Sequence, residues 1–206
     1  MKNKSEVFKF VCLTVFLFYI SIINAQNIDI NILRDINVNR NKNLDPTFKS
    51  VTRSALPISI ATPIIMYSAG MIKKDSTIKK QAIFIGETFL VNAFITTALK
   101  QVVKKQRPFE TYSDIDQVIS TGGYSFPSGH TSTAFATATS LSMVYPKWYV
   151  IAPSFVWASA VGYSRMHLGV HYPSDVFAGA ILGSGSAYLT YKANKWINKK
   201  RSKKEK

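Results

Sequence analysis

The stretch Ser-Arg-Met-His-Leu-Gly-Val-His-Tyr-Pro-Ser-Asp, residues 164–175, concentrates reactive side chains between two apolar runs of the chain. It holds two of the three histidines of the 206-residue protein. Arginine can bind an oxyanion, histidine can attack or shuttle protons, and a nearby carboxylate can orient that histidine. We expect Pro173 to begin the last helix, because proline is tolerated at the first helical position. The stretch therefore predicts part of a site, in the turn between two helices.

Around this stretch the chain contains five apolar segments, each with the length and composition of a helix. They predict an all-α fold, a helical bundle of about five or six helices if a hydrophobic leader is counted, which we expect to span a membrane. A length of 206 residues suits one domain with a substantial core. The apolar segments are residues 55–72, 82–99, 130–145, 149–163 and 176–191.

Together with these segments, the remaining residues divide the chain into four predicted parts. Residues 1–25 combine lysines with an apolar run, which is typical of a signal peptide or of an uncleaved first membrane helix. Residues 26–53 are an exported polar segment, which we expect to be a solvated connection with a short surface helix around residues 28–36. Residues 54–191 hold the helical domain. The basic residues 192–206 form a C-terminal tail, which we expect to be partly disordered.

The net charge of +15, from 26 Lys and Arg against 11 Asp and Glu, predicts an anionic partner. Much of the excess lies in the tail and in the lysines of residues 73–80, next to long apolar segments. Anionic lipid is the polyanion nearest to such positions. The charge therefore indicates a membrane partner rather than nucleic acid.

The basic residues also predict how the helices cross a membrane. If residues 26–53 are exported, alternate loops place residues 73–80 and the tail on the cytoplasmic side. Residues 100–129 and 164–175 then lie together on the opposite side. Several apolar segments are shorter than the ~20 residues that span a bilayer, and Glu87 and Asn92 interrupt the second one. An exported soluble all-α protein therefore stays open as an alternative.

Three cationic clusters fall in the two loops that are predicted to meet. Such an array suits a phosphoryl group, whose transfer depends on positioning and on neutralising the charge of its oxygens. Lysine supplies a point charge, whereas each arginine offers a planar fork to two oxygens. The clusters are Lys100-x6-Arg107-Pro108, Pro127-Ser128-Gly129-His130 and Ser164-Arg165-x5-His171-x3-Asp175.

The second and third clusters each predict a role for a histidine. Ser128 is a natural N-cap for the helix that follows, so that free backbone N–H groups face the loop and His130 can protonate a leaving oxygen. Asp175, in the first turn of the last helix, can fix the tautomer of His171 and leave its other nitrogen free to attack. Alone, each pattern also fits a simple helix cap or a structural hydrogen bond. Their occurrence together with the cations favours a phosphate site.

The three clusters resemble the three-part signature of the type 2 phosphatidic acid phosphatase superfamily, and they match every fixed position of it in order. That superfamily includes lipid phosphate phosphatases, bacterial acid phosphatases and vanadium-dependent haloperoxidases. The resemblance implies that His171 is the nucleophile, that Asp175 orients it, and that His130 is the general acid and later the base. It implies no metal and no cofactor. The phosphate ligands that it implies are Lys100, Arg107, Ser128, Gly129 and Arg165.

The resemblance also implies a function, that of a membrane phosphatase with a phosphohistidine intermediate and a site facing the periplasm or exterior, such as that of a bacterial inner membrane. Candidate substrates are phosphatidic acid, phosphatidylglycerophosphate, undecaprenyl diphosphate and lipid A phosphate. The alternatives are an exported soluble acid phosphatase, a haloperoxidase that depends on vanadate, and a non-catalytic lipid-phosphate binder. A pure binder would not need His130, His171 and Asp175 together.

His167 and His171 have the i,i+4 spacing of a zinc-binding helix face. Gly169 between them predicts a loop rather than a helix, and the glutamate of a His-Glu-x-x-His motif is absent. We therefore expect His167 to have a packing or substrate-facing role rather than to bind a metal.

Overall fold

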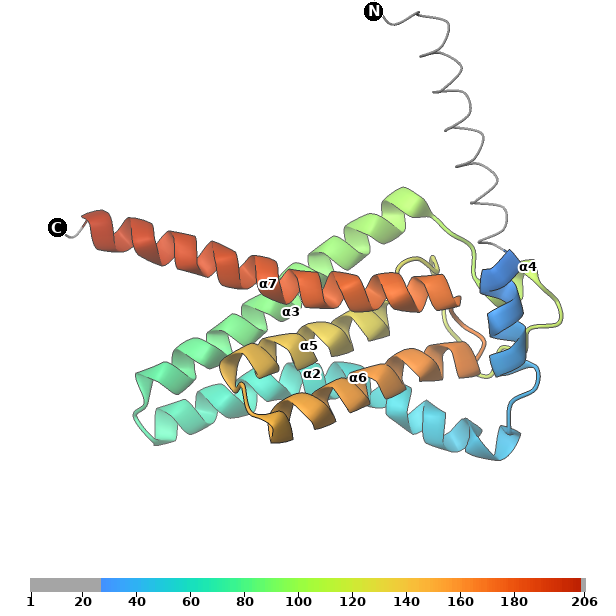
Figure 1. Ribbon diagram of the computed structural model, residues 1–206, viewed down its shortest axis with the longest axis horizontal. Helices are drawn as coiled ribbons and strands as arrows, with labels where there is room; N and C mark the ends of the chain where they lie inside the picture. The colour runs from blue at the N-terminus through green and yellow to red at the C-terminus, as the bar shows by residue number, and fades with distance from the viewer. Residues whose placement is uncertain (1–26, 205–206) are drawn as a thin grey trace, which may run out of the picture.

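The computed structural model describes residues 27–204, and within this range every regular element is helical (Figure 1). A first helix covers residues 27–37. The leader that we interpret as a signal peptide or membrane helix lies outside the described residues. The other elements are the 3₁₀ turn η1 (Lys42–Leu44) and the helices α2 (Asp45–Ile72), α3 (Ser76–Val103), α4 (Pro108–Thr111), α5 (Gly129–Val144), α6 (Trp148–His167) and α7 (Pro173–Lys204).

Each of the five predicted apolar segments lies in a separate helix, with only residue 145 beyond a helix end, so the all-α prediction is confirmed. Most of the helices are longer than their apolar runs. Helix α2 begins at Asp45, which with Pro46 supplies the acidic residue and the proline of a helix start. Helix α7 begins at Pro173, as expected, but continues to Lys204. The prediction of a partly disordered tail is therefore wrong for residues 192–204, the part of the tail whose backbone the structure describes.

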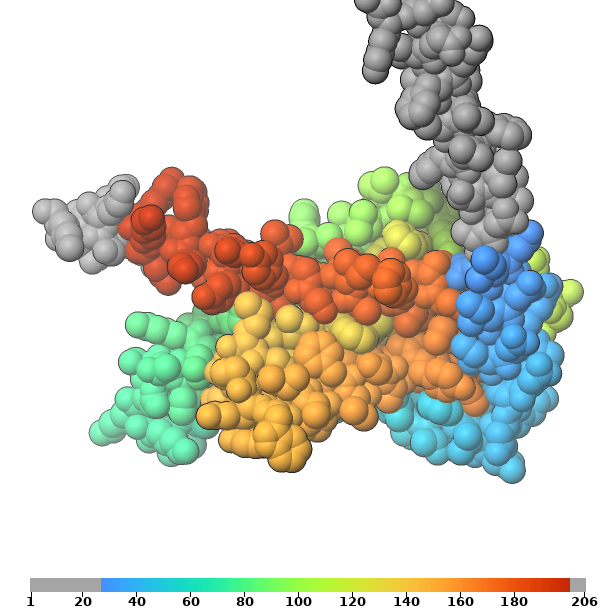
Figure 2. Space-filling model, viewed as in Figure 1, coloured from blue at the N-terminus to red at the C-terminus, as the bar shows by residue number. Residues whose placement is uncertain are grey.

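The long helices alternate in direction, which brings the two predicted loops to one end of the bundle (Figure 1). Helices α3 and α6 end there, whereas α5 and α7 begin there. The lysine-rich turn of residues 73–75 and the turn of residues 145–147 lie at the other end. Figure 2 shows the last turns of α7 projecting beyond the body of the molecule. The residues predicted to form a site and the basic turns are thus separated by the length of the bundle.

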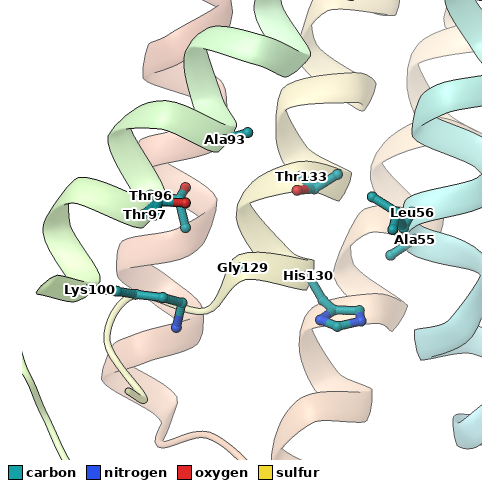
Figure 3. Close-up of a pocket in the computed structure, with 9 residues that line it drawn as sticks. All are labelled: Ala55, Leu56, Ala93, Thr96, Thr97, Lys100, Gly129, His130 and Thr133. Atoms are coloured by element: carbon teal, nitrogen blue, oxygen red, sulfur yellow. The ribbon is translucent and has the colours of Figure 1, made fainter. Parts of the chain in front are cut away.

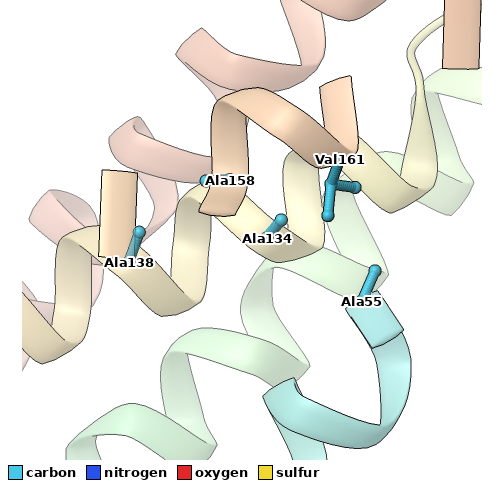
Figure 4. Packing of buried hydrophobic residues seen from close by; sticks show 5 residues of the cluster. All are labelled: Ala55, Ala134, Ala138, Ala158 and Val161. Atoms are coloured by element: carbon cyan, nitrogen blue, oxygen red, sulfur yellow. The ribbon is translucent and has the colours of Figure 1, made fainter. Parts of the chain in front are cut away.

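Helix α5 is the central helix, since it packs against α2, α3, α6 and α7. Its buried positions are alanine, serine and threonine, which allow neighbouring helices to approach closely. Figure 4 shows Ala134 and Ala138 of α5 packed with Ala55 of α2 and with Ala158 and Val161 of α6. Helix α5 as a whole is thereby fixed relative to the other long helices.

Two glycines of α7 allow it to pack directly on α5. A Cβ atom at Gly183 would lie 2.1 Å from the carbonyl oxygen of Ser132, and one at Gly179 would lie 2.8 Å from that of Ser128. Only glycine permits this backbone contact. The Gly-x-x-x-Gly spacing is one that occurs where membrane helices approach closely. This contact sets the start of α7 beside the start of α5.

The helix of residues 27–37 is more than the solvated connection that we expected. It lies across the end of the bundle where the loops meet (Figure 1). Ile30 and Leu33 are buried, and they pack with Ile115 and Tyr172. Asn37 is also buried, and it donates hydrogen bonds to the carbonyl oxygens of His167 and Asp116. The expectation of a solvated segment is therefore wrong for these residues.

The outer surface of the bundle is strongly apolar. Two stretches, Lys42–Ile72 and Ser76–Thr111, are long and apolar enough to cross a membrane, and only 17% and 28% of their most apolar windows are buried. Core helices of a soluble protein would be mostly buried. Large exposed apolar surfaces mark contact with a membrane or another protein, so this surface favours a membrane protein over the soluble alternative. The most exposed residues include Ile65, Ile72, Leu90, Phe94, Val156 and Phe177.

Candidate active site

The structure brings all three predicted clusters to the same end of the bundle. Arg107 of the first cluster contacts His171 of the third, with 3.3 Å between the guanidinium NH1 and Nε2. The backbone N–H of Ser128 in the second cluster donates to the carbonyl oxygen of Asp175 across 3.0 Å. The chain segments that are separated in sequence therefore form one site, as the alternating helices predicted.

His171 and Asp175 are both buried, and a serine joins them. Nδ1 of His171 lies 3.3 Å from Oγ of Ser125 and 3.5 Å from Oδ2 of Asp175. The Ser125 hydroxyl donates to that same carboxylate oxygen. The oxygen of the Ser125 hydroxyl can then accept a hydrogen bond from Nδ1–H of His171. This arrangement places the proton on Nδ1 and leaves the lone pair of Nε2 free, on the side of the ring that faces Arg107.

The electrostatics of the pair fit this assignment. Burial lowers the pKa of His171, so its ring is neutral at neutral pH. Burial alone would raise the pKa of Asp175, but the hydrogen bond to His171 and the charge of Lys105 outweigh it and lower the pKa. The site thus holds a neutral imidazole beside an ionised carboxylate, which are the states needed for a histidine nucleophile and its orienting group.

Arg107 is buried, and the loops around it fix the guanidinium. Nε donates to the carbonyl oxygen of Gly123, NH1 to that of Val170 and NH2 to that of Gly122, each at 2.8–2.9 Å. NH1 also lies 3.3 Å from Nε2 of His171, so these contacts use four of the five N–H groups of the arginine and leave one, on NH2, without a partner. The side chain is thus a positively charged group held rigidly beside Nε2 of His171.

Lys100, Gly129 and His130 line a cavity of about 260 Å³ between α2, α3 and α5. Figure 3 shows Lys100 and His130 at the same end of this cavity, with Gly129 between them. Lys100 donates to the carbonyl oxygen of Tyr124 at 2.6 Å, which holds its ammonium group near the loop. Ser128 is the N-cap residue of α5, as predicted, although its hydroxyl bonds to Thr131 rather than to the helix backbone. The rest of the cavity is lined by Ala55, Leu56, Ala93, Thr96, Thr97 and Thr133.

Arg165, near the end of α6, is buried with a polar group unused. Its NH1 donates to the hydroxyl of Thr52 at 2.7 Å, but its Nε has no hydrogen-bond partner among the described residues. A buried donor without a partner is costly, which suggests that a ligand completes it. Arg165 and His130 line a second cavity, together with residues of α2.

His167 packs between helices. Its Nε2 lies 2.9 Å from Oδ1 of Asp45, and its ring lies against Phe48 with 4.3 Å between centroids. Gly169 follows with φ at 72°, and a side chain there would collide with the carbonyl oxygen of Asp116. The turn at Gly169 directs His171 into the site and away from His167. Of the two roles expected for His167, the structure thus supports packing.

Sequence reasoning missed three residues that hold Asp175 and the turn around it. Ser125 bridges His171 and Asp175, and Lys105 donates to Oδ1 of Asp175 across 2.9 Å. Asp29, from the helix of residues 27–37, accepts from the backbone N–H of Ser174 at 2.8 Å and lies 3.4 Å from Lys105. Lys105 lies within the first cluster, where its extra positive charge was the only sequence signal for such a role.

The fold and the site define a helical protein that carries a cationic, histidine-containing site at one end of its bundle. The model of one family, described as the PAP2 superfamily, matches residues 81–199, more than half of the chain. The chain belongs to the PAP2 superfamily, in agreement with the resemblance of the three clusters.

Several relatives of the chain are named as phosphatases. It is 39% identical over 70 residues to a lipid A 4'-phosphatase of Bacteroides thetaiotaomicron, an alignment covering 34% of this chain and 31% of that protein. It is 35% identical over 111 residues to an undecaprenyl-diphosphatase of Sulfolobus acidocaldarius, covering 52% of this chain and 53% of that protein. The chain thus spans between about a third and about half of the length of these two relatives.

Solved structures agree with the fold. LpxE of Aquifex aeolicus aligns with a TM-score of 0.68 and 28% identity, over 80% of this chain and 95% of that one. A PAP2-type phosphatidylglycerolphosphate phosphatase of Bacillus subtilis aligns with a TM-score of 0.67 over 90% of this chain and 96% of that one, at 24% identity. Both superpositions cover four fifths or more of this chain.

Proposed function

We propose that this chain is a membrane phosphatase that hydrolyses a terminal phosphate monoester or diphosphate of a lipid through a phosphohistidine at His171. The observation that carries the proposal is the orientation of His171. Its Nδ1 is held by Ser125 and Asp175, and its Nε2 faces the guanidinium of Arg107 at 3.3 Å. A phosphate bound by that guanidinium would lie in front of the free lone pair.

In the first step Nε2 of His171 attacks phosphorus, and the bond from phosphorus to the lipid oxygen breaks. Asp175 stabilises the positive charge that develops on the ring. His130 donates a proton to the leaving oxygen, which releases the lipid alcohol or lipid phosphate. Lys100, Arg107, Arg165 and the N–H groups beyond Ser128 and Gly129 neutralise the charge of the phosphoryl oxygens.

In the second step water attacks the phosphorus of the phosphohistidine. His130, now neutral, accepts a proton from that water, and the bond between phosphorus and Nε2 breaks. Inorganic phosphate leaves, and His171 returns to its neutral state. The two steps together add one water across the phosphate ester, so atoms and charge balance without any cofactor.

Several features support a lipid as the substrate. The cavity that ends at Lys100 and His130 is lined mainly by apolar and threonine side chains from α2, α3 and α5. The outer surfaces of α2 and α3 are exposed and apolar, so an acyl or prenyl chain could enter between them from a bilayer. The lipid phosphates named for the relatives agree with this class. Phosphatidic acid, phosphatidylglycerophosphate, undecaprenyl diphosphate and lipid A phosphate are the candidates.

The charge distribution supports a site on the exterior or periplasmic side of the membrane. The site loops lie at one end of the bundle, and the lysines of residues 73–80 and the basic end of α7 lie toward the other. Basic residues near membrane helices favour the cytoplasmic side. The site would then open away from the cytoplasm, where exported lipid phosphates are hydrolysed.

Phosphate release by the purified chain in detergent tests the proposed function. The panel contains the four lipid phosphates and a soluble aryl phosphate, each with and without vanadate and a metal chelator. We expect release from at least one lipid phosphate, inhibition by vanadate, and resistance to the chelator. The variants His171→Asn and His130→Asn should lose activity while remaining in the membrane fraction. Full activity in both variants would contradict the proposal.

A further inference from the structure

His130 also lines a second cavity, of about 430 Å³, whose chemistry differs from that of the first. The first cavity has mostly alanine, leucine and threonine in its walls, whereas the second has three cationic side chains. Two of these, Lys49 and Arg53, come from α2, and the third is Arg165. The loop of residues 118–121 supplies the remaining wall, together with Thr52.

Lys49 and Arg53 are four residues apart on α2, so they lie on the same face of that helix. Thr52, next to Arg53, accepts the hydrogen bond from NH1 of Arg165. This bond ties the buried arginine of α6 to the face of α2 that carries the other two cations. The three positive groups are therefore part of one built surface.

This surface lacks negative charge among residues 27–200, whose side chains the structure describes. No carboxylate in that range lies within 4.0 Å of the cationic groups of Lys49, Arg53 or Arg165. Nε of Arg165 is buried without a partner in that range, and the residue as a whole is 2% exposed. A group of cations around one cavity, with a buried donor unused, indicates a site for an anion.

The phosphate that is cleaved accounts for only part of this charge. It must lie at Nε2 of His171, where Arg107 is held, and neither of these residues lines the second cavity. Lys100 and Gly129 line the first cavity and not the second. Only His130 and Arg165 are placed to connect the cleaved phosphate with the surface formed by Lys49 and Arg53. The second cavity therefore begins where the leaving oxygen is expected to be protonated.

We infer that Lys49 and Arg53 bind a second phosphoryl group of the substrate, the one that stays on the lipid after hydrolysis. In a lipid diphosphate that group is joined to the cleaved phosphate through the leaving oxygen, next to His130. The subsite makes lipid diphosphates better substrates than lipid monophosphates of the same chain. The inference rests on the proposed function, and it selects one substrate class within it.

The test compares a prenyl diphosphate with the prenyl monophosphate of equal chain length, as substrates of the full chain in uncharged detergent micelles. The ratio of the two kcat/KM values measures the discrimination by the subsite. Removing both charges in Lys49→Met/Arg53→Gln should lower that ratio about tenfold or more, mainly through KM for the diphosphate, because two charge-assisted contacts are lost. Lys195→Met is the control, since Lys195 lines a cavity at the opposite end of the bundle.

A second measurement does not depend on the diphosphate itself being hydrolysed. Methylenediphosphonate should inhibit the wild-type protein more strongly than orthophosphate, and the double variant should lose most of this preference. Equal losses on both substrates would show that the two side chains only attract anionic lipid or micelles in general, and would overturn the inference. An unchanged ratio would also overturn it. A wild-type protein that hydrolyses another lipid phosphate but neither prenyl substrate would overturn the inference and leave the proposed function intact, whereas one that hydrolyses no lipid phosphate would remove the proposed function as well.

Discussion

Lys105 donates a hydrogen bond to Oδ1 of Asp175 across 2.9 Å, and this oxygen is not the one that accepts from Ser125. Oδ2 of the same carboxylate also accepts from the backbone N–H of Tyr172 at 3.1 Å. The carboxylate beside His171 is therefore held by donors on both oxygens. Its orientation is thus determined by Ser125, Lys105 and the backbone of Tyr172, none of which is a fixed position of the three clusters.

Replacing Lys105 with methionine should reduce kcat about tenfold and change KM little, because one charge-assisted hydrogen bond to the orienting carboxylate is lost. The positive charge of Lys105 lowers the pKa of Asp175. Its removal should therefore raise that pKa and shift the acid limb of the pH profile of kcat toward higher pH. Lys104→Asn is the matched control, since Lys104 is exposed and makes no side-chain bond to a described residue. An unchanged pH profile in Lys105→Met would contradict this role.

Ser125→Ala should lower kcat by roughly ten- to a hundredfold with little change in KM, because the ring of His171 loses the hydroxyl that joins it to Asp175. Ser125→Thr retains a hydroxyl and should recover part of the rate. Steady-state kinetics on one lipid phosphate would check both variants. If the alanine variant kept full kcat, the direct contact of His171 with Asp175 at 3.5 Å would be sufficient by itself.

The packing of α7 on α5 predicts a stability effect far from the reacting atoms. Gly183→Ala should lower the free energy of unfolding by about 1–3 kcal/mol or more, because the added methyl group overlaps the backbone of Ser132. Gly185→Ala is the control, since nothing lies within 4 Å of its added Cβ atom. Thermal unfolding in detergent would compare them. Equal midpoints for the two variants would mean that α7 can move away from α5 without cost.

Acid should destabilise the folded chain because of His171. Burial lowers its pKa in the folded state, whereas the unfolded chain takes up a proton near the ordinary histidine pKa of about 6.5. Below that pH the unfolded state binds more protons, so stability is lost as the pH falls toward the lowered pKa. The unfolding midpoint should therefore decrease between about pH 7 and pH 5. His171→Asn should show a smaller decrease, and an identical decrease would refute this origin.

The bundle could be predicted well from sequence because its helices have long apolar runs. The positions at which the helices begin and end were harder to predict from sequence. Asp45-Pro46 is a standard helix start, but it lies in a polar segment that we interpreted as a connection. The burial of Leu33 could not be predicted, since only the folded loops supply its partners, Ile115 and Tyr172. Composition was also misleading in the basic tail, where lysine-rich sequence continues a helix.

The predicted site residues came from spacing, and the helix directions were sufficient to place their loops together. What spacing could not predict is the set of contacts that fix each side chain. Ser125 lies 50 residues before Asp175 and Asp29 lies 145 residues before Ser174, so their contacts exist only in the tertiary structure. The second cationic surface was missed because Lys49 and Arg53 lie in the same polar segment and match no motif.

The most direct test of the central claim is the identification of the phosphorylated residue. The purified chain would be mixed with a lipid carrying labelled terminal phosphate, quenched in alkali to preserve phosphohistidine, and mapped by mass spectrometry. We predict label on His171 in the wild-type protein and none in His171→Asn. Label on His130, or steady turnover with no labelled histidine, would contradict the assignment of His171 as the nucleophile.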